Sequence, residues 1–249
     1  MADACYNVAE PDPVVGGLPF FSEEDDYWIS PHQGRGTLGT LASYNDDPVG
    51  VKVLHIVQDL CSDDPDDWSY YQYCRDFGDE AADYDRDLDS VLINFNENYS
   101  AEAKIRDPIQ QTDEDVVGYY SQTYVNWMAN NQENVLKAGI ATGRTTGPIT
   151  ESDIDASPDP YADCVDLNGE GIEIDHHIAH GDSGSMVYTE DENNDMTLVG
   201  MLHAIGDPND DDPTCSSWDV EAYGEDPVGP AAFSMVGSHT GLEFYHTGS

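Results

Sequence analysis

Short β-branched and aromatic runs, separated by Gly, Pro, Asn and Asp, recur along the chain, and this pattern constrains the fold most strongly. Examples are residues 51–57, 91–93 and 198–202. Such runs between turn-forming residues are typical of strands in β-barrels, whereas alternating βαβ units would place helical segments between them. The 249 residues suit a single all-β unit. The sequence therefore predicts an all-β fold.

The loop Gly181-Asp182-Ser183-Gly184 carries the strongest functional signal. Acyl transfer through a tetrahedral intermediate needs two backbone N–H groups directed at one developing oxyanion. A glycine two residues before a serine lets the backbone turn its amides inward without a Cβ clash, and Gly184 permits a close approach of the backbone behind the nucleophile. Ser183 is therefore the candidate nucleophile, and the amides of Gly181 and Ser183 are the candidate oxyanion hole. The alternative is that the tetrapeptide is an ordinary turn.

This loop resembles the nucleophile loop of the trypsin-like serine peptidases, in which such an aspartate is structural. The resemblance implies a base and an acid upstream, recognised by role rather than by position. His55 lies within a β-branched run that resembles the strand end carrying the general base. Asp89 precedes a short apolar run, like the buried acid of the family, and Asp87 and Asp85 are its rivals. The implied triad is Ser183, His55 and Asp89.

Other segments extend the resemblance over residues 35 to 245. They are residues 36–41, 135–139, 143–147, 185–188 and 198–202. The resemblance implies two six-stranded antiparallel β-barrels with the active site between them. It also implies short helical insertions and a terminal helix over residues 232–244.

The expected domain organisation follows from these segments. It consists of an N-terminal arm (1–34), a first barrel (35–112) with an acidic insertion (61–87), an inter-barrel insertion (113–134), and a second barrel with the C-terminal helix (135–249). The first insertion weakens the assignment of Asp89. Tyr119, Tyr120, Tyr124, Trp127 and Met128 have a partly helical spacing in the second insertion, which predicts a short amphipathic helix that packs or forms a contact surface.

The charge balance describes the environment of the protein. The chain has 51 Asp and Glu against 8 Lys and Arg, a formal net charge of −43. Such self-repulsion opposes a compact state, but at ~1 M salt the Debye length falls to about 3 Å and screens most of it. We therefore expect a protein of hypersaline surroundings. Acids spread along a chain that is 39% hydrophobic fit this better than an acidic tail or a surface that docks a basic partner. Phosphate repulsion argues against nucleic acid as a partner.

The first 34 residues lack the basic region and continuous apolar core of a signal peptide, and no segment is long enough to span a membrane. We expect cytoplasmic synthesis and no membrane partner. The arm is expected to pack on its own barrel or on a neighbouring subunit. This suggests assembly partners, for example in a virus particle of a halophilic host.

Histidines cluster beside the candidate nucleophile. On a strand, His176 and His180 would share a face while His177 points away, so one metal ion on all three would require a bend. The family resemblance instead places His177 at the floor and His203 at a wall of the primary specificity pocket. Histidines there would favour cleavage after Glu or Asp, and the alternative is that they only complete the pocket wall.

Two further residue patterns could in principle bind metals or form cross-links. The acidic clusters at 191–195 and 207–212 do not have EF-hand spacing, and we expect solvated loops rather than Ca²⁺ sites. No Cys-x-x-Cys pair suggests zinc. Five cysteines leave at least one unpaired: Cys61 with Cys74 and Cys164 with Cys215 are possible disulfides, and Cys5 is the odd one. No metal or cofactor is expected.

Two functions remain. The first is a serine endopeptidase that hydrolyses peptide bonds of peptides or proteins in high salt. The second is a peptidase-derived structural or binding subunit of a large assembly, with or without proteolytic activity. A purely structural descendant has no need to keep His55, an acid and Ser183 together, which favours the enzyme. A fold can nevertheless be retained without its activity.

Overall fold

The computed structural model describes residues 14–24, 35–54, 68–72, 75–78, 81–85, 90–95, 101–106, 112–140, 142–154, 171–176, 178, 181–202, 231–233 and 242–243. The strands in the first half of the chain are β1 (Val14–Gly16), β2 (Pro19–Glu24), β3 (Arg35–Thr37), β4 (Thr40–Tyr44), β5 (Asp47–Val53), β6 (Trp68–Gln72), β7 (Arg75–Gly78), β8 (Ala81–Asp85), β9 (Ser90–Asn94) and β10 (Ala101–Arg106). They are followed by β11 (Asp113–Tyr119), helix α1 (Gln122–Asn130), β12 (Asn134–Gly139), β13 (Gly143–Ile154), β14 (Gly171–Ile174), β15 (Met186–Glu190), β16 (Met196–Leu202), β17 (Ala231–Phe233) and β18 (Leu242–Glu243). The all-β prediction is confirmed.

The second half of the chain forms a closed barrel. Strands β12, β13, β14, β17, β16 and β15 pair in that order, and β15 pairs back to β12. Every pairing in this ring is antiparallel. Closure leaves none of the six strands as an open sheet edge, which is how antiparallel barrels avoid edge-to-edge aggregation. This ring is the six-stranded antiparallel barrel expected for the second half.

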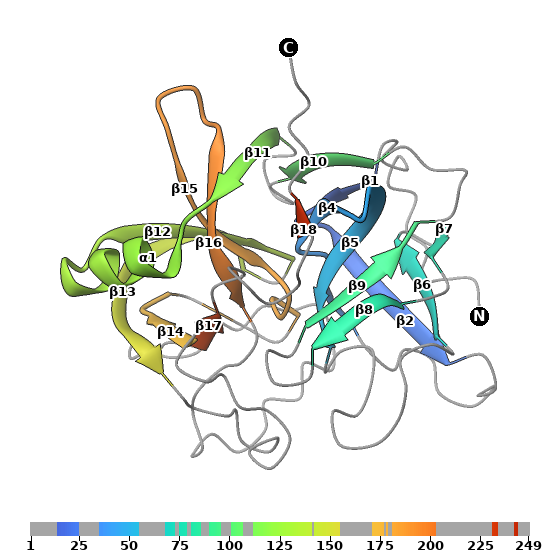
Figure 1. Ribbon diagram of the computed structural model, residues 1–249, viewed down its shortest axis with the longest axis horizontal. Coiled ribbons are helices and arrows are strands. Elements are labelled where there is room, and N and C mark those ends of the chain that lie inside the picture. Colours follow the sequence, from blue (N-terminus) through green and yellow to red (C-terminus); the bar gives the residue numbers. More distant parts are fainter. Residues whose placement is uncertain are drawn as a thin grey trace.

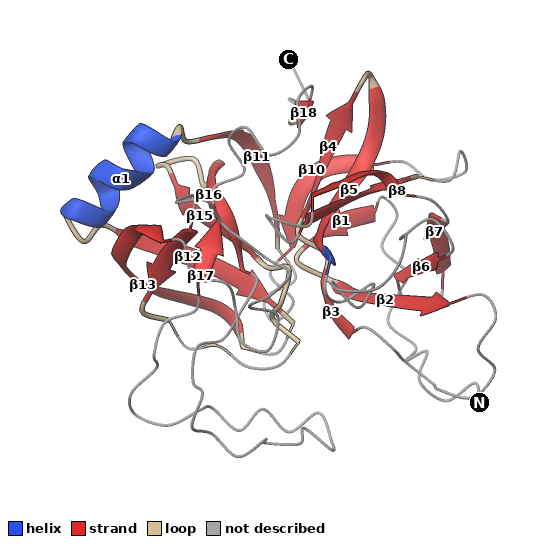
Figure 2. Ribbon diagram, turned by 60° about the horizontal axis from the view of Figure 1, so that its bottom comes forward, coloured by secondary structure: helices blue, strands red, loops and turns tan. Residues whose placement is uncertain are grey.

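The first half of the chain forms a four-stranded sheet, β3-β2-β6-β7, and supplies four strands of a five-stranded sheet, β18-β4-β5-β9-β8, whose remaining strand β18 comes from residues 242–243. These strands form a body beside the second barrel, and helix α1 lies at the far side of that barrel (Figures 1 and 2). Strand β11 links the halves, because it pairs antiparallel with β10 and parallel with β16. A continuous nine-stranded sheet therefore runs from one half into the other.

Several expected boundaries differ from the structure. Residues 14–24, assigned to the arm, form β1 and β2, which pair with β10, β3 and β6. Residues 113–119 form β11 rather than an insertion. Strand β8 lies inside the expected acidic insertion 61–87 and pairs with β9, which follows it. These residues find partner strands far along the chain, which local sequence cannot reveal.

The predicted C-terminal helix over residues 232–244 is wrong at both of its ends. Ala231–Phe233 is strand β17, which pairs with β14 and β16 and completes the ring of the second barrel. Leu242–Glu243 is strand β18, which pairs with β4 of the first half. Tertiary pairing overrides weak local helix propensity in such short segments.

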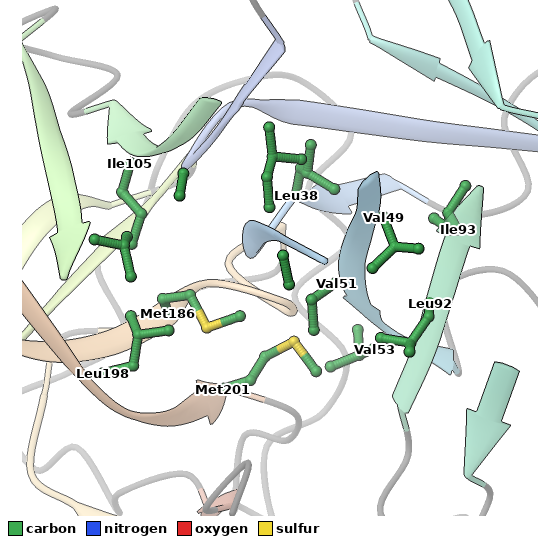
Figure 3. Packing of buried hydrophobic residues seen from close by; sticks show 14 of the residues in the cluster. Leu38, Val49, Val51, Val53, Leu92, Ile93, Ile105, Met186, Leu198 and Met201 are labelled. Atoms are coloured by element: carbon green, nitrogen blue, oxygen red, sulfur yellow. The ribbon is translucent and has the colours of Figure 1, made fainter. Parts of the chain in front are cut away.

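Two apolar clusters form the core. The larger one joins the halves, because it contains side chains of β4, β5 and β9 together with Met186, Leu198 and Met201 of the second barrel. Figure 3 shows Val51 and Val53 of β5 facing the two methionines. The smaller one includes Val187 and packs beneath α1. Met186 and Val187 enter different clusters because successive side chains of a strand point to opposite faces. The core thus fixes strand β15, which leads directly out of the candidate nucleophile loop.

Helix α1 confirms the short helix expected between the barrels. It ends where Gln132 adopts a left-handed backbone (φ 51°), and the Asn131 side-chain amide donates to the carbonyl of Trp127. Val125, Met128 and Ala129 are buried against the second core. On the other face Tyr124 and Trp127 are 43% and 47% exposed, and their rings stack 5.2 Å apart. The helix therefore both packs and presents an aromatic face. Within the described ranges, no helix has the length and apolar character needed to cross a membrane.

Candidate active site

The loop that carries Ser183 is a tight, glycine-dependent turn ahead of β15. Gly181 and Gly184 adopt φ values of 104° and 90°, a region that side-chain-bearing residues avoid. A Cβ on Gly184 would also collide with the carbonyl oxygen of Thr37. Ser183 lies between these two glycines and is half-buried. The requirement for glycine on either side of the serine, expected from the sequence, is therefore a backbone requirement of this loop.

Asp182 attaches the loop to the second barrel through Lys137 of β12. Its side chain and that of Lys137 are both fully buried, and Lys137 Nζ lies 2.8 Å from Asp182 Oδ2. Thr142 adds a hydroxyl bond of 2.6 Å to the same oxygen and a backbone N–H bond of 3.2 Å to the other. Burial lowers the pKa of Lys137, and the charge of Asp182 opposes this shift. With these contacts Asp182 acts as a structural carboxylate.

Two residues of the first half hold the loop from the opposite side. The Ser183 carbonyl accepts hydrogen bonds from the backbone N–H of Thr37 (2.9 Å) and from Lys52 Nζ (3.0 Å). The Thr37 hydroxyl donates to the carbonyl of Gly181 at 2.9 Å. Thr37 lies on β3 and Lys52 on β5, both in the first half of the molecule. Together with the Lys137–Asp182 pair, these contacts attach the loop to both halves.

The remaining loop peptides are held within the second barrel. Gly184 N–H donates to the Leu202 carbonyl at 2.7 Å, and Leu202 N–H donates to the Ser185 carbonyl at 2.8 Å. Ser185 N–H and Ser185 Oγ both donate to the carbonyl of Asp182. Bonds on both sides of Ser183 leave its backbone little freedom to move, as preorganised hydrogen-bond donors require.

Four residues predicted to take part in catalysis or substrate binding lie outside the described residues. They are His55, Asp89, His177 and His203. The strands that lead to the first two are described: β5 and β9 are antiparallel, and Val53 pairs with Ser90. Of the two alternatives to Asp89, Asp87 also lies outside the described residues. Asp85 belongs to β8, and its backbone pairs with that of Ser90.

His176 is a buried histidine of the second barrel. It is 1% exposed; its Nδ1 lies 3.1 Å from Thr145 Oγ1, and its Nε2 lies 3.3 Å from the Gly147 carbonyl. A carbonyl only accepts, so we assign the proton to Nε2 and let Thr145 donate to Nδ1. Burial, and then the charge of Lys137, lowers the pKa of His176 to about 4. Both ring nitrogens are engaged with the protein itself, which argues against His176 as a metal ligand.

The first acidic cluster forms a self-contained turn. Asp191 Oδ1 accepts hydrogen bonds from the backbone N–H groups of Asn193 (2.7 Å) and Asp195 (3.0 Å). These bonds lower the pKa of Asp191. No group of three or more His, Cys, Asp or Glu side chains with metal-binding geometry occurs among the residues that the structure describes. The second acidic cluster, His180 and all five cysteines lie outside them.

The structure also adds residues that sequence reasoning missed: Thr37, Lys52, Lys137 and Thr142. Lys52 and Lys137 are two of only three lysines in the chain, and both are fully buried within β-branched runs. A lysine in an apolar strand is unusual because a buried ammonium needs hydrogen-bond partners. The two lysines within apolar strands could have been noticed in the sequence, but the sequence does not show which residues accept their hydrogen bonds.

Comparison with known proteins assigns the fold. No family model matches the sequence, and no curated protein matches it either. Among solved structures, Thermobifida fusca Protease A has a TM-score of 0.59 at 16% identity, over 93% of this chain and 97% of its own. A glutamic acid specific serine protease that uses a histidine triad in substrate binding gives 0.63 at 16% identity, over 93% and 100%. Alpha-lytic protease homolog N4 gives 0.59 at 16% identity, over 94% and 100%. The chain therefore has the fold of the trypsin-like serine proteases.

Proposed function

We propose that the protein is a serine endopeptidase with Ser183 as its nucleophile. The observation that carries this proposal is the loop itself, which places Ser183 between two glycines of positive φ and is tethered to both halves of the molecule. Its backbone N–H and that of Gly181 are the proposed donors to the oxyanion of the tetrahedral intermediate. In this mechanism His55 takes the proton of the Ser183 hydroxyl and passes it to the leaving amine.

The strand register supports His55 and Asp89 as the partners of Ser183. Lys52 contacts the Ser183 carbonyl, and His55 follows three residues later, within about 10 Å along the chain. Val53 of β5 pairs with Ser90 of β9. His55 lies two residues after Val53, and Asp89 lies one residue before Ser90. Because the two strands are antiparallel, both residues lie beyond the same end of this strand pair. The proposed role of Asp89 is to orient the imidazole and stabilise its protonated form. Asp87 and Asp85 remain the alternatives to be tested.

The proposed substrate preference is cleavage after an acidic residue, with His177 and His203 in the pocket. One solved structure of this fold belongs to a protease specific for glutamic acid that binds substrate through histidines, which supports the idea by analogy. A net charge of −43 repels acidic substrates at low salt, and screening at ~1 M salt removes most of this repulsion. We therefore expect the preference for Glu over Leu or Ala to appear in high salt.

Active-site labelling tests the proposal. The native chain is treated with a fluorophosphonate in multimolar salt beside Ser183→Ala and His55→Ala, and intact mass is measured. We expect one adduct on the native chain, mapped to Ser183, and none on either variant. Ser43→Ala is a matched control in β4 and should label like the native chain. A folded native protein that forms no adduct would contradict the proposal and favour a structural subunit of an assembly.

The orienting acid and the pocket require separate variants. Asn replaces Asp89, Asp87 or Asp85 in turn, and kcat is measured for each. Only the orienting acid should show a fall of about 10⁴-fold, because its loss leaves the imidazole in the wrong tautomer. Peptides that differ only in Glu, Leu or Ala before the scissile bond test the pocket. Equal kcat/KM for all three would contradict the proposed preference.

A further inference from the structure

We infer that Lys52 is a positioning residue that holds the nucleophile loop in its reactive geometry from the neighbouring half of the molecule. The catalytic consequence rests on the proposed function, whereas the structural one does not. Lys52 lies on β5, where its backbone pairs with Val91 of β9, and its side chain is 0% exposed. Its long side chain thus extends from the first half of the molecule and places its ammonium group beside the Ser183 loop.

The ammonium group of Lys52 bridges two carbonyl groups. It donates to Thr37 at 2.5 Å and to Ser183 at 3.0 Å. Thr37 N–H donates to the same Ser183 carbonyl at 2.9 Å, so that one oxygen accepts two hydrogen bonds. Both donors belong to strands of the first half. The position of the Ser183 carbonyl is therefore set by Lys52 and Thr37.

Burial makes this contact strong. An ammonium group taken out of water needs hydrogen-bond partners, because the unpaired charge is very unfavourable in a protein interior. Hydrogen bonds from a charged donor are also about twice as strong as neutral ones. Displacing the loop would deprive the Lys52 ammonium of one of these partners. The two carbonyl contacts therefore favour the observed position of the loop beside this buried charge.

Gly184 shows how closely the loop backbone approaches Lys52. A Cβ at Gly184 would lie 2.6 Å from Lys52 Nζ and 3.3 Å from Lys52 Cδ. Any residue larger than glycine would push the loop and the ammonium apart. Glycine after the serine is therefore required by the positive φ of 90°, and its missing side chain also leaves room for the Lys52 ammonium. Gly184 and Lys52 form a matched pair, although they are far apart in the sequence.

The contact matters for chemistry because Ser183 contributes both its hydroxyl and its N–H to the proposed mechanism. Its carbonyl belongs to the same residue, so a shift of that carbonyl also moves the hydroxyl and the oxyanion donor. A misplacement of 1 Å by a residue outside the reacting atoms can lower a rate by about 100-fold. A residue that only stabilised the fold would leave the rate of the folded enzyme unchanged.

The kinetic test uses Lys52→Met, which keeps the length of the apolar stem and removes the charge and the donors. Lys104→Met is the matched control, because Lys104 is a partly exposed lysine of β10 paired with Glu102. Labelling rates with the fluorophosphonate are measured in high salt at a temperature at which circular dichroism shows all chains folded. We expect Lys52→Met to react about 10- to 100-fold more slowly and Lys104→Met to match the native rate. A native rate for folded Lys52→Met would overturn the inference.

Hydrogen exchange supplies a readout that does not need activity. In Lys52→Met the N–H groups of Thr37 and Gly184 should exchange faster, while N–H groups of β12, such as Lys137, keep their protection. If the native chain forms no adduct but this local change appears, the proposed function fails and the positioning role stands. Unchanged exchange at Thr37 and Gly184 would overturn the role in either case. If Lys52→Met does not fold, Lys52→Gln, which keeps a neutral donor, takes its place in both measurements.

Discussion

The buried His176 makes the stability of the protein depend on pH in a way that one variant can isolate. Its pKa is lowered from 6.5 to about 4, chiefly by burial. The unfolded chain therefore binds a proton at this histidine below about pH 6.5, while the folded chain resists it until about pH 4. Stability associated with His176 is present above pH 6.5 and is lost as the pH falls toward 4. One pKa unit corresponds to about 1.4 kcal/mol, so the full loss is about 3 kcal/mol.

The perturbation is His176→Gln, which removes the titration and keeps hydrogen-bonding groups near Thr145 and Gly147. Many carboxylates titrate over the same range, so the informative quantity is the difference in unfolding free energy between native chain and variant. It is measured by urea unfolding at pH 7, 6, 5 and 4 and constant high salt. We expect the advantage of the native chain to shrink by about 3 kcal/mol between pH 7 and pH 4. A constant difference would refute the assignment of His176 as a buried neutral histidine.

Three further predictions concern the loop anchor, the helix and the charge. Lys137→Met should lower the unfolding free energy by about 3–5 kcal/mol because it removes the cation that balances the buried carboxylate of Asp182. Adding Asp182→Leu should restore most of the loss in the same urea titration, and additive losses would contradict this. Met128→Ala should destabilise by about 2–5 kcal/mol, whereas the half-exposed Trp127→Ala should change stability by about 0.5 kcal/mol or less in thermal unfolding; similar losses would show that the helix faces are misassigned. Raising KCl from ~0.1 to ~1 M should raise the urea midpoint, because screening shortens from about 10 to 3 Å, and an unchanged midpoint would contradict the role of self-repulsion.

Local features of the sequence were sufficient to predict part of the molecule. The runs at 135–139 and 143–147 form the paired strands β12 and β13, and those at 185–188 and 198–202 lie at β15 and β16. Each of these pairs is close in sequence or flanks a marked turn, so alternation and glycine spacing are informative. The left-handed glycines around Ser183 were predictable for the same reason, because a backbone constraint acts on the residue that bears it.

Features that depend on distant pairing were not predictable from local sequence. A helix was expected from residue 232 onward, yet residues 231–233 are the strand that lies between β14 and β16 and closes the ring. Residues 14–24 lack a strong strand pattern and are strands because β10, β3 and β6 supply their hydrogen bonds. In such short elements the partner, rather than the propensity of the segment, determines the conformation.

The contrast is sharpest at the nucleophile loop, where one residue combines both kinds of information. Gly184 was predicted to allow a close backbone approach, and its neighbours are the carbonyl of Thr37 and the ammonium of Lys52. The sequence reveals that something approaches, since glycine stands where a side chain would clash, but it does not reveal what. Lys52 gives the complementary clue, a cation within an apolar strand that must find hydrogen-bond acceptors. Each residue explains the other only when the two halves of the fold are brought together, so unexplained glycines and buried lysines are best interpreted as possible partners.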